Sequence, residues 1–439
     1  MYPDNSSRSR ALNDRAKASL PGGNTRTTVY MAPYPIYAAR GEGCRVWDVD
    51  GEARIDCINN FTAAIHGYAH PVLTRAAQEQ IVLGTAFGMP TESEIALAEL
   101  LAARVPSVDQ LRFLNSGTEA VMSAVKAARA FTGRPKIAKC EGAYHGSYDF
   151  SEVSLDSPPS SWDAGAPTSQ AYARGTPQGV LDDVIVIPFN DVDAAVEILR
   201  AHAKDLAGIL VDPMPNRAGL VPADRAFIQA LREIADEIGA LLIFDEVISF
   251  RLGFNGAQAI WGVDADLTAF GKIIGGGFPV GAIGGRREVM AVFDPSHGKP
   301  PLPQGGTFSA NPMSMRCGHA AMSLLDDVAF ATLARQGDWL RAEIDRAFQD
   351  TGIPGYATGM GSLLRLHFTD RPVRDYRTAY PNPQAAGRLD QLVRHALNEG
   401  VIMAPYGLMA LSTPMTDDDI AQIGSAITSS LQHISRTSN

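Results

Sequence analysis

One lysine of this chain has the surroundings of a reactive amine. Lys272 lies in "FGKIIGGGFPVGAIGG", with a run of glycines just after it and almost no other charged residue nearby in the sequence. Most lysines lie on solvated faces. However, an amine with few competing charges keeps a larger neutral fraction near pH 7, and glycines let other groups approach without obstruction. We therefore expect Lys272 to condense with a carbonyl group.

Two more motifs carry groups that can bind a phosphate and a ring nitrogen. In "NSGTEA", Ser116, Gly117 and Thr118 lie at a helix start, where free backbone amides and short hydroxyls can hold a phosphate. An ordinary helix N-cap at Ser116 or Thr118 explains the same residues. In "IFDEVISF", Asp245 and Glu246 lie at the carboxyl end of an apolar strand, where open α/β sheets bind ligands. A capping carboxylate is the alternative interpretation of that pair.

Taken together, these motifs contain the groups that pyridoxal phosphate requires. The amine of Lys272 condenses with the cofactor aldehyde, and the Ser-Gly-Thr turn holds the phosphate. The carboxylate of Asp245 keeps the pyridine nitrogen protonated, so that the ring can accept electrons from the substrate. The sequence therefore predicts pyridoxal phosphate as the cofactor.

Other nucleotide motifs fail at defined positions. A Walker loop would need glycine where the chain has Asp266, and Ser or Thr where it has Ile273. The dinucleotide fingerprint would need glycine where the chain has Val280. Lys272 is therefore not a P-loop lysine.

A metal site has weak support. His66 and His70 in "HGYAH" are spaced to ligate a metal if that segment is helical, but no third ligand follows nearby. We expect no metal.

The middle of the chain alternates short apolar runs with helical patterns. "LRFLNSG" is followed by the helical "TEAVMSAVKAARAF", and "AGILVDP" by "ADRAFIQALREIADEIG". "ALLIFDEV", "ADLTAFGK" and "VGAIGG" are further apolar runs bounded by Gly, Pro or Asp. Such runs predict an α/β fold with a buried, largely parallel sheet covered by helices.

The two ends of the chain differ from the middle. "GCRVWDVDGEARIDCIN" alternates around Asp50 and Gly51, which predicts a hairpin. The C-terminal region mixes helices such as "RLDQLVRHALNEG" with short strands such as "SLLRLHF". We expect a large cofactor-binding domain over residues 66–324, and a smaller domain built from residues 1–65 and 325–439.

Composition narrows the class of protein. The chain has 439 residues, of which 45% are hydrophobic and 20% charged, and its net charge is -10. These values indicate a globular protein with small-molecule partners rather than a nucleic-acid or membrane surface. No secretory pattern or transmembrane run is visible, so we expect a cytoplasmic protein. The four cysteines are scattered without a CxxC pair and are expected to be reduced thiols.

The motifs, in register, resemble one family. "NSGTEAVMSAVKAAR", "GAYHGSYD", "LLIFDEVISFRLG", "DLTAFGKIIGGGFPVGAIGG" and "GTFSANPMSM" are similar to the class III pyridoxal-phosphate aminotransferases. The subgroup they most resemble contains the glutamate-1-semialdehyde aminomutases and the β-amino-acid, or β-phenylalanine, aminotransferases. This resemblance implies fold-type I, with a mostly parallel sheet of the seven-stranded type and a smaller α+β domain.

The resemblance also implies roles for the reacting groups. Lys272 would be the Schiff-base lysine and then the general base and acid of a 1,3-proton shift. Asp245 would pair with the pyridine nitrogen. Tyr144 would stack on one face of the ring with His145 beside it, and Val247 would pack against the other face.

The phosphate contacts are implied in the same way. Ser116, Gly117 and Thr118 would hold the phosphate within one chain. Thr307 of "GTFSANP" would reach the phosphate of the partner subunit, so the resemblance implies a homodimer with shared active sites.

Substrate binding is implied by fewer residues. Arg26 in "NTRT" matches an arginine that binds a substrate carboxylate, for which a guanidinium is suited, with an exposed loop arginine as the alternative. At two positions that bear on substrate binding, this chain departs from its relatives. Relatives of the β-phenylalanine type carry arginine where this chain has Tyr406, and many carry a Glu-Pro pair where it has Asp212.

These inferences predict a ping-pong aminotransferase that moves nitrogen from a β-amino acid or related amine to a 2-oxo acid, 2-oxoglutarate or pyruvate. An intramolecular aminomutase like the glutamate-1-semialdehyde enzymes is the first alternative. A non-catalytic protein that binds pyridoxal phosphate is the second, and the presence of both Lys272 and Asp245 argues against it.

Overall fold

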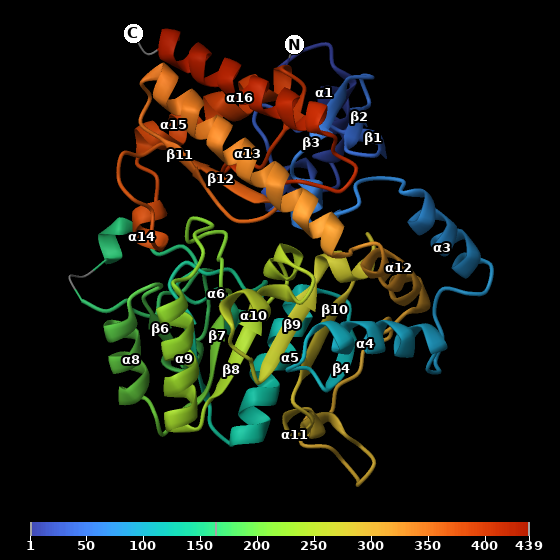
Figure 1. Cartoon of the computed structure of the whole chain (residues 1–439), viewed down its shortest axis with the longest axis vertical. Coiled ribbons are helices and arrows are strands. Elements are labelled where there is room, and N and C mark those ends of the chain that lie inside the picture. Colours follow the sequence, from blue (N-terminus) through green and yellow to red (C-terminus); the bar gives the residue numbers. More distant parts are fainter. Residues whose placement is uncertain (1, 163–164, 438–439) are drawn as a thin grey trace.

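A seven-stranded sheet forms the centre of the molecule (Figure 1). The computed structural model describes residues 2–162 and 165–437. The strand order is β4-β10-β9-β8-β7-β5-β6, and only β10 runs against its neighbours. The strands are β4 (Gln110–Leu114), β5 (Lys136–Cys140), β6 (Val184–Ile187), β7 (Leu206–Val211), β8 (Leu241–Asp245), β9 (Leu267–Gly271) and β10 (Gly281–Gly285). The predicted mostly parallel α/β sheet is confirmed.

The strands are apolar throughout because both faces of this sheet are covered. Phe244 in β8 packs in one core cluster with Phe227 of α9 (Arg225–Ile238). Its neighbour Ile243 points to the opposite face and packs in another cluster with residues of α5 (Gly117–Thr132). Since successive strand residues alternate between faces, two covered faces require a continuous apolar run.

The remaining helices of the central region surround the sheet and its edges. They are α3 (Pro71–Ile81), α4 (Glu92–Arg104), α6 (Asp149–Glu152), α7 (Gln178–Asp182), α8 (Val192–Ala201), α10 (Gly256–Trp261), α11 (Arg287–Met290) and α12 (Pro312–Ser323). In the part of the chain that the structure describes, no helix is long and apolar enough to cross a membrane.

The two ends of the chain lie together on one side of the large sheet (Figure 1). A four-stranded sheet has the order β1-β2-β3-β13, and its last strand comes from the C-terminal region. The predicted hairpin is present, since β2 and β3 pair antiparallel across the Asp50–Gly51 turn. The four strands are β1 (Ala38–Glu42), β2 (Arg45–Asp48), β3 (Ala53–Asp56) and β13 (Val401–Ile402).

A second small sheet and several helices complete this region. The sheet is antiparallel and contains β11 (Tyr356–Thr358), β12 (Leu363–His367) and β14 (Leu408–Ala410). The helices are α1 (Arg8–Ala16), α2 (Asn59–Thr62), α13 (Asp327–Thr351), α14 (Tyr376–Ala379), α15 (Pro383–Asn398) and α16 (Asp417–Thr437). We propose that residues 1–65 and 325–439 form one smaller domain beside residues 66–324.

A buried arginine connects the seven-stranded sheet to the region that contains the two ends of the chain. Arg251 follows β8 closely and is 1% exposed. Its guanidinium donates hydrogen bonds to the carbonyls of Thr62 and Leu411 and to the hydroxyl of Ser362. Burial lowers the pKa of Arg251 to about 9. A buried charge with this many carbonyl partners rigidly joins the segments that supply them.

Candidate active site

A cavity of about 360 Å³ lies at the carboxyl edge of the seven-stranded sheet, and we name it the reaction cavity. Open α/β sheets bind ligands at this edge because the loops that follow parallel strands converge there. Nine of the ten site residues predicted from the sequence line it: Arg26, Ser116, Gly117, Thr118, Tyr144, His145, Asp245, Val247 and Lys272. Residues more than 200 positions apart in the chain, such as Arg26 and Lys272, thus meet in one place.

Asp245 ends β8 and is held by two donors. Its Oδ2 atom lies 2.8 Å from Nδ1 of His145, and its Oδ1 accepts the backbone N–H of Val247 at 3.0 Å. His145 is 1% exposed, and burial lowers its pKa although the Asp245 carboxylate opposes that shift. A neutral imidazole therefore donates Nδ1–H to the carboxylate. Among the described residues, its buried Nε2 atom has no hydrogen-bond partner.

Lys272 follows β9 with its backbone in the left-handed region, at φ 52°. In the part of the chain that the structure describes, its ammonium makes no hydrogen bond and no ion pair within 4.0 Å. Burial lowers the pKa of Lys272, and the carboxylates of Asp245 and Asp212 partly oppose this. The sequence neighbours of Lys272 are uncharged, and the fold brings to it Asp245, which was expected in the site, together with Asp212.

Asp212 was singled out from the sequence only as a departure from relatives, without a role in the site. It follows β7, lies 5% exposed in the reaction cavity, and accepts the backbone N–H of Met214 at 2.9 Å. Burial, with the neighbouring Asp245 second, raises the pKa of Asp212 well above its ordinary range. The two carboxyl groups are neighbours because β7 and β8 pair in parallel, with Val211 opposite Phe244. Each lies at the carboxyl end of a short apolar run, which is the pattern that pointed to Asp245.

The Ser-Gly-Thr turn begins α5, as expected. The hydroxyl of Ser116 accepts the backbone N–H of Glu119 at 3.1 Å, so the N-cap interpretation describes this side chain. The hydroxyl of Thr118 accepts the backbone N–H of Ser147 at 3.1 Å. Within the described residues, the backbone N–H groups of Gly117 and Thr118 have no acceptor. Two free amides at the start of a long helix suit an anion such as a phosphate.

Val247 and Tyr144 form walls of the reaction cavity. A Cβ at Gly117 would lie 2.8 Å from Cγ1 of Val247, so the valine fits only because that position is glycine. Tyr144 is 43% exposed, which leaves its ring accessible from the cavity. The cavity therefore has an apolar wall, an aromatic wall, an anion site, an amine and a buried carboxylate. These groups fit pyridoxal phosphate.

Arg26 reaches the reaction cavity from the N-terminal loop. Its guanidinium donates a hydrogen bond of 2.8 Å to Oδ1 of Asn60 and lies 5.6 Å from the centre of the Phe61 ring. Asn60 also lines the cavity and was not predicted from the sequence. The arginine is exposed, so a carboxylate can reach it.

Other residues singled out from the sequence lie elsewhere. Thr307 is exposed and does not line the reaction cavity of its own chain. Tyr406 is also outside the lining and lies 5.7 Å from the guanidinium of Arg365, measured to its ring centre. Both ring nitrogens of His66 have hydrogen-bond partners, Thr413 and the Ala321 carbonyl. Hydrogen bonds to protein groups therefore satisfy both ring nitrogens of His66.

Most of the chain is similar to known enzymes. Residues 28–431 match the profile of the family described as aminotransferase class-III. The chain is 42% identical over 373 residues to the glutamate-1-semialdehyde 2,1-aminomutase of Methanothermobacter thermautotrophicus, covering 85% of this chain and 86% of that protein. It is 39% identical over 410 residues to the β-phenylalanine transaminase of Variovorax paradoxus, covering 93% and 89%. The crystal structure of an omega-transaminase from Sphaerobacter thermophilus is 51% identical and superposes with a TM-score of 0.96 over 98% of both chains.

Proposed function

Because this chain belongs to the class III aminotransferases, which use pyridoxal phosphate, we propose that it moves an amino group from a β-amino acid or related amine to a 2-oxo acid by a ping-pong mechanism. The observation that carries this proposal is that Lys272 and Arg26 line one cavity. The amine supplies the chemistry, and the guanidinium supplies a partner for a carboxylate.

The bound cofactor supplies an aldehyde for amines and a protonated ring that accepts electrons. We assign to Lys272 Nζ the covalent attachment of that cofactor, and then the transfer of a proton at the substrate carbon that carries nitrogen. The lowered pKa of Lys272 supports this role, because a base acts only in its neutral form.

Asp245 holds a proton on the ring nitrogen in this proposal, and His145 positions Asp245. The Nδ1–H of the neutral imidazole fixes one carboxylate oxygen, and the Val247 amide fixes the other. Burial and the neighbouring Asp245 raise the pKa of Asp212, so charging both carboxyl groups at once is disfavoured. Asp245 is the group that we assign to the ring nitrogen.

The other predicted residues bind and orient. The free amides of Gly117 and Thr118 suit the phosphate, and Val247 and Tyr144 suit the two ring faces. Arg26 binds the carboxylate of the donor in the first half-reaction and that of the 2-oxo acid in the second. We also propose a cytoplasmic homodimer in which Thr307 of each chain contacts the phosphate in the other.

The aminomutase alternative is supported by the 42% identity to a glutamate-1-semialdehyde aminomutase. The two functions differ in their need for an acceptor. We would mix the holoenzyme with a panel of β-amino acids and amines and follow the cofactor absorbance of each half-reaction. Turnover that requires 2-oxoglutarate or pyruvate supports transamination. Intramolecular transfer needs an oxo group and an amine in one molecule, so glutamate-1-semialdehyde is added to the panel. An isomer of it formed without any acceptor supports the mutase. Unchanged absorbance with every amine and with this substrate contradicts both functions.

A further inference from the structure

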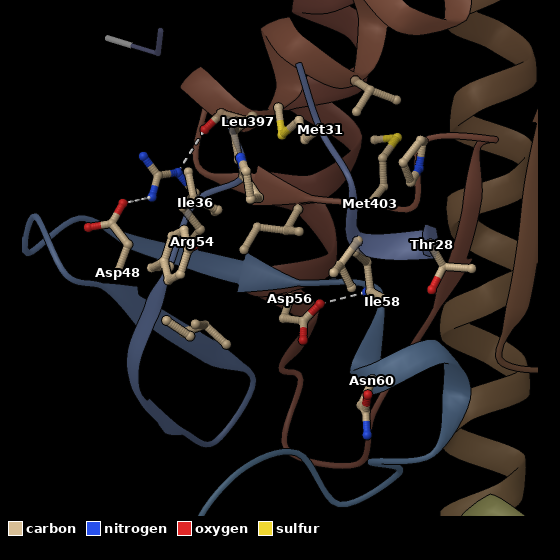
Figure 2. A pocket seen from close by; sticks show the side chains of 18 of the residues that line it. Thr28, Met31, Ile36, Asp48, Arg54, Asp56, Ile58, Asn60, Leu397 and Met403 are labelled. Carbon is tan, nitrogen blue, oxygen red and sulfur yellow. Dashed lines mark hydrogen bonds and ion pairs between the residues drawn. The ribbon is translucent and has the colours of Figure 1, made fainter. Parts of the chain in front are cut away.

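Buried cations in this fold differ in how their charge is compensated. In a cavity of about 780 Å³ lined in part by the N-terminal loop, Arg54 forms an ion pair with Asp48, and its Nε donates to the Leu397 carbonyl at 3.0 Å (Figure 2). Lys139 in β5 is 0% exposed, but no carboxylate oxygen of the described residues lies within 4.0 Å of its ammonium. Because burying an unpaired charge is costly, the groups that this ammonium contacts indicate its role.

The ammonium of Lys139 joins the two ends of one loop. Its Nζ donates to the carbonyl of Cys140 at 3.2 Å, where β5 ends, and to the carbonyl of Val153 at 2.8 Å, directly after α6. The backbone N–H of Gly142 donates to the Ser154 carbonyl at 2.8 Å. The loop is therefore closed at its base by a backbone hydrogen bond and by the ammonium of Lys139.

The loop closed in this way carries two groups of the reaction cavity. It comprises residues 141–153, and we name it the clamped loop. Tyr144 and His145 line the reaction cavity, and Nδ1 of His145 lies 2.8 Å from Oδ2 of Asp245. Between Cys140 and α6 the loop contains no regular helix or strand, so its path depends on the contacts at its ends and on those of its side chains.

Neighbouring charges do not neutralise Lys139. The adjacent Glu141 forms its ion pair with Arg377, at 2.6 Å between Oε2 and Nε. Burial lowers the pKa of Lys139 to about 8, which Cys140 and Glu141 partly oppose and Arg217 reinforces. The ammonium is therefore charged at pH 7, and its hydrogen bonds to the two loop carbonyls are charge-assisted.

The charge of Lys139 also acts on His145. Burial is the largest cause that lowers the pKa of His145, the Asp245 carboxylate opposes it, and Lys139 adds to the lowering. Lys139 keeps its charge up to about pH 8, which spans the range in which an imidazole ordinarily takes up a proton. A protonated His145 would convert the hydrogen bond with Asp245 into an ion pair, and the carboxylate would then offer less negative charge to a ring nitrogen.

We propose that Lys139 is a positioning residue for amino transfer, which holds the clamped loop closed and keeps His145 a neutral donor to Asp245. This inference rests on the role that the proposed function gives to Asp245. The clamp decides where Tyr144 and His145 lie. The charge decides in which protonation state His145 meets Asp245.

Two substitutions separate the clamp from the charge. Lys139→Gln keeps two N–H donors on a neutral side chain. Lys139→Met removes both the donors and the charge, and leaves an unbranched side chain that suits a buried position. Lys136→Met is the matched control, because Lys136 lies at the other end of the same strand, with its ammonium 4.0 Å from the Asp183 carboxylate.

The clamp is measured without any turnover. Hydrogen–deuterium exchange of residues 141–153, followed by mass spectrometry of the cofactor-free protein, reports how often the loop opens. We expect about tenfold faster exchange in Lys139→Met, a smaller increase in Lys139→Gln, and parent rates in Lys136→Met. Parent rates in Lys139→Met as well would overturn the clamp.

The charge is measured on the holoenzyme by titrating the cofactor absorbance with pH, which needs no amine substrate. We expect the acidic transition to lie at higher pH in Lys139→Gln and Lys139→Met than in the parent, because His145 takes up a proton more readily without a neighbouring cation. A change of loop structure alone does not predict this shift in Lys139→Gln, whose amide retains N–H donors. The same transition in all four proteins would contradict the electrostatic role.

Steady-state kinetics with an active amine of the donor panel complete the test. We expect Lys139→Met to lower kcat about tenfold or more with a smaller change in KM, since Tyr144 and His145 are assigned to the cofactor rather than to the donor. Lys139→Gln should recover part of that loss, and Lys136→Met should keep the parent kcat. An unchanged kcat in Lys139→Met would overturn the inference. If the parent turns over no substrate of the panel, the proposed function fails, while exchange and absorbance still test Lys139.

Discussion

The Nδ1 atom of His145 lies 2.8 Å from the carboxylate of Asp245, and both side chains are buried. Because burial lowers the pKa of the histidine, the contact is a hydrogen bond from a neutral imidazole rather than a pair of full charges. It fixes the orientation of the carboxylate that we assign to the ring nitrogen.

His145→Ala should therefore lower kcat more than it alters KM. The loss of a hydrogen bond to a buried charge costs about 1.5–3 kcal/mol, which corresponds to a rate reduced roughly tenfold to a hundredfold. His145→Asn, which restores an N–H donor, should recover part of this. Steady-state kinetics and the pH dependence of the cofactor absorbance measure both effects. An unchanged kcat in His145→Ala would show that Asp245 needs no such support.

Lys272→Ala should abolish nearly all turnover, because the covalent attachment and the proton carrier are lost together. The exposed Lys126 of α5 offers a matched control in Lys126→Ala. Single-turnover kinetics and the absorbance spectrum after dialysis distinguish the two variants. A Lys272→Ala protein that keeps the spectrum and rate of the parent would refute the assignment.

Asp212 should make stability depend on pH. Its pKa is raised in the folded protein, so its contribution to stability is fully present below its unfolded pKa of about 4 and is lost as pH rises toward the folded value. Asp212→Asn removes this loss of stability at rising pH, because an amide does not titrate in this range. We expect the variant to gain stability over the parent as pH increases, by about 1.4 kcal/mol per pH unit within that window.

Urea unfolding of the cofactor-free protein at pH 5 and pH 7 measures this difference. The exposed Asp264 provides a control in Asp264→Asn, which should show no such trend. The difference in stability between Asp212→Asn and the parent could also be the same at both pH values. That result would mean that Asp212 has the same pKa in the folded and the unfolded protein.

Arg26→Ala should damage carboxylate substrates selectively. The loss of a charge-assisted pair costs about 1.5–3 kcal/mol in kcat/KM for those donors, and much less for amines without a carboxylate. This is tested by comparing kcat/KM for 3-aminobutanoate and for sec-butylamine, which differ only in that a methyl group replaces the carboxylate. Equal losses for both would identify Arg26 as a structural residue.

Thr307 should act on the neighbouring chain if the proposed shared site is correct. Homodimers of Lys272→Ala and of Thr307→Asp should each be nearly inactive, the second because a carboxylate repels the phosphate. Random subunit exchange gives about half hybrids with one intact site of two, so activity should recover to roughly a quarter of the parent value. Native mass spectrometry confirms exchange, and hybrids that form but stay inactive would exclude a contact in trans.

The sequence by itself determined the fold class and the chemical character of the site. Continuous apolar runs between helices require a sheet that is buried on both faces, and the runs identified in the sequence became β4, β7, β8, β9 and β10. Asp245 and Lys272 each follow such a run, and the carboxyl ends of parallel strands share one edge. Local sequence was sufficient here because the period of a strand and the direction of a parallel sheet are local properties.

Only the tertiary structure decided which groups meet. Strand order places Asp212 beside Asp245, although the sequence treats them as ends of separate strands. The fold turns His145 onto Asp245 and brings Arg26 to Asn60, across distances that no periodicity encodes. The pKa values follow from that packing, because desolvation depends on every neighbour of a charge and not on its sequence context. The charges around Lys272 could therefore not be predicted from the uncharged residues beside it in the chain.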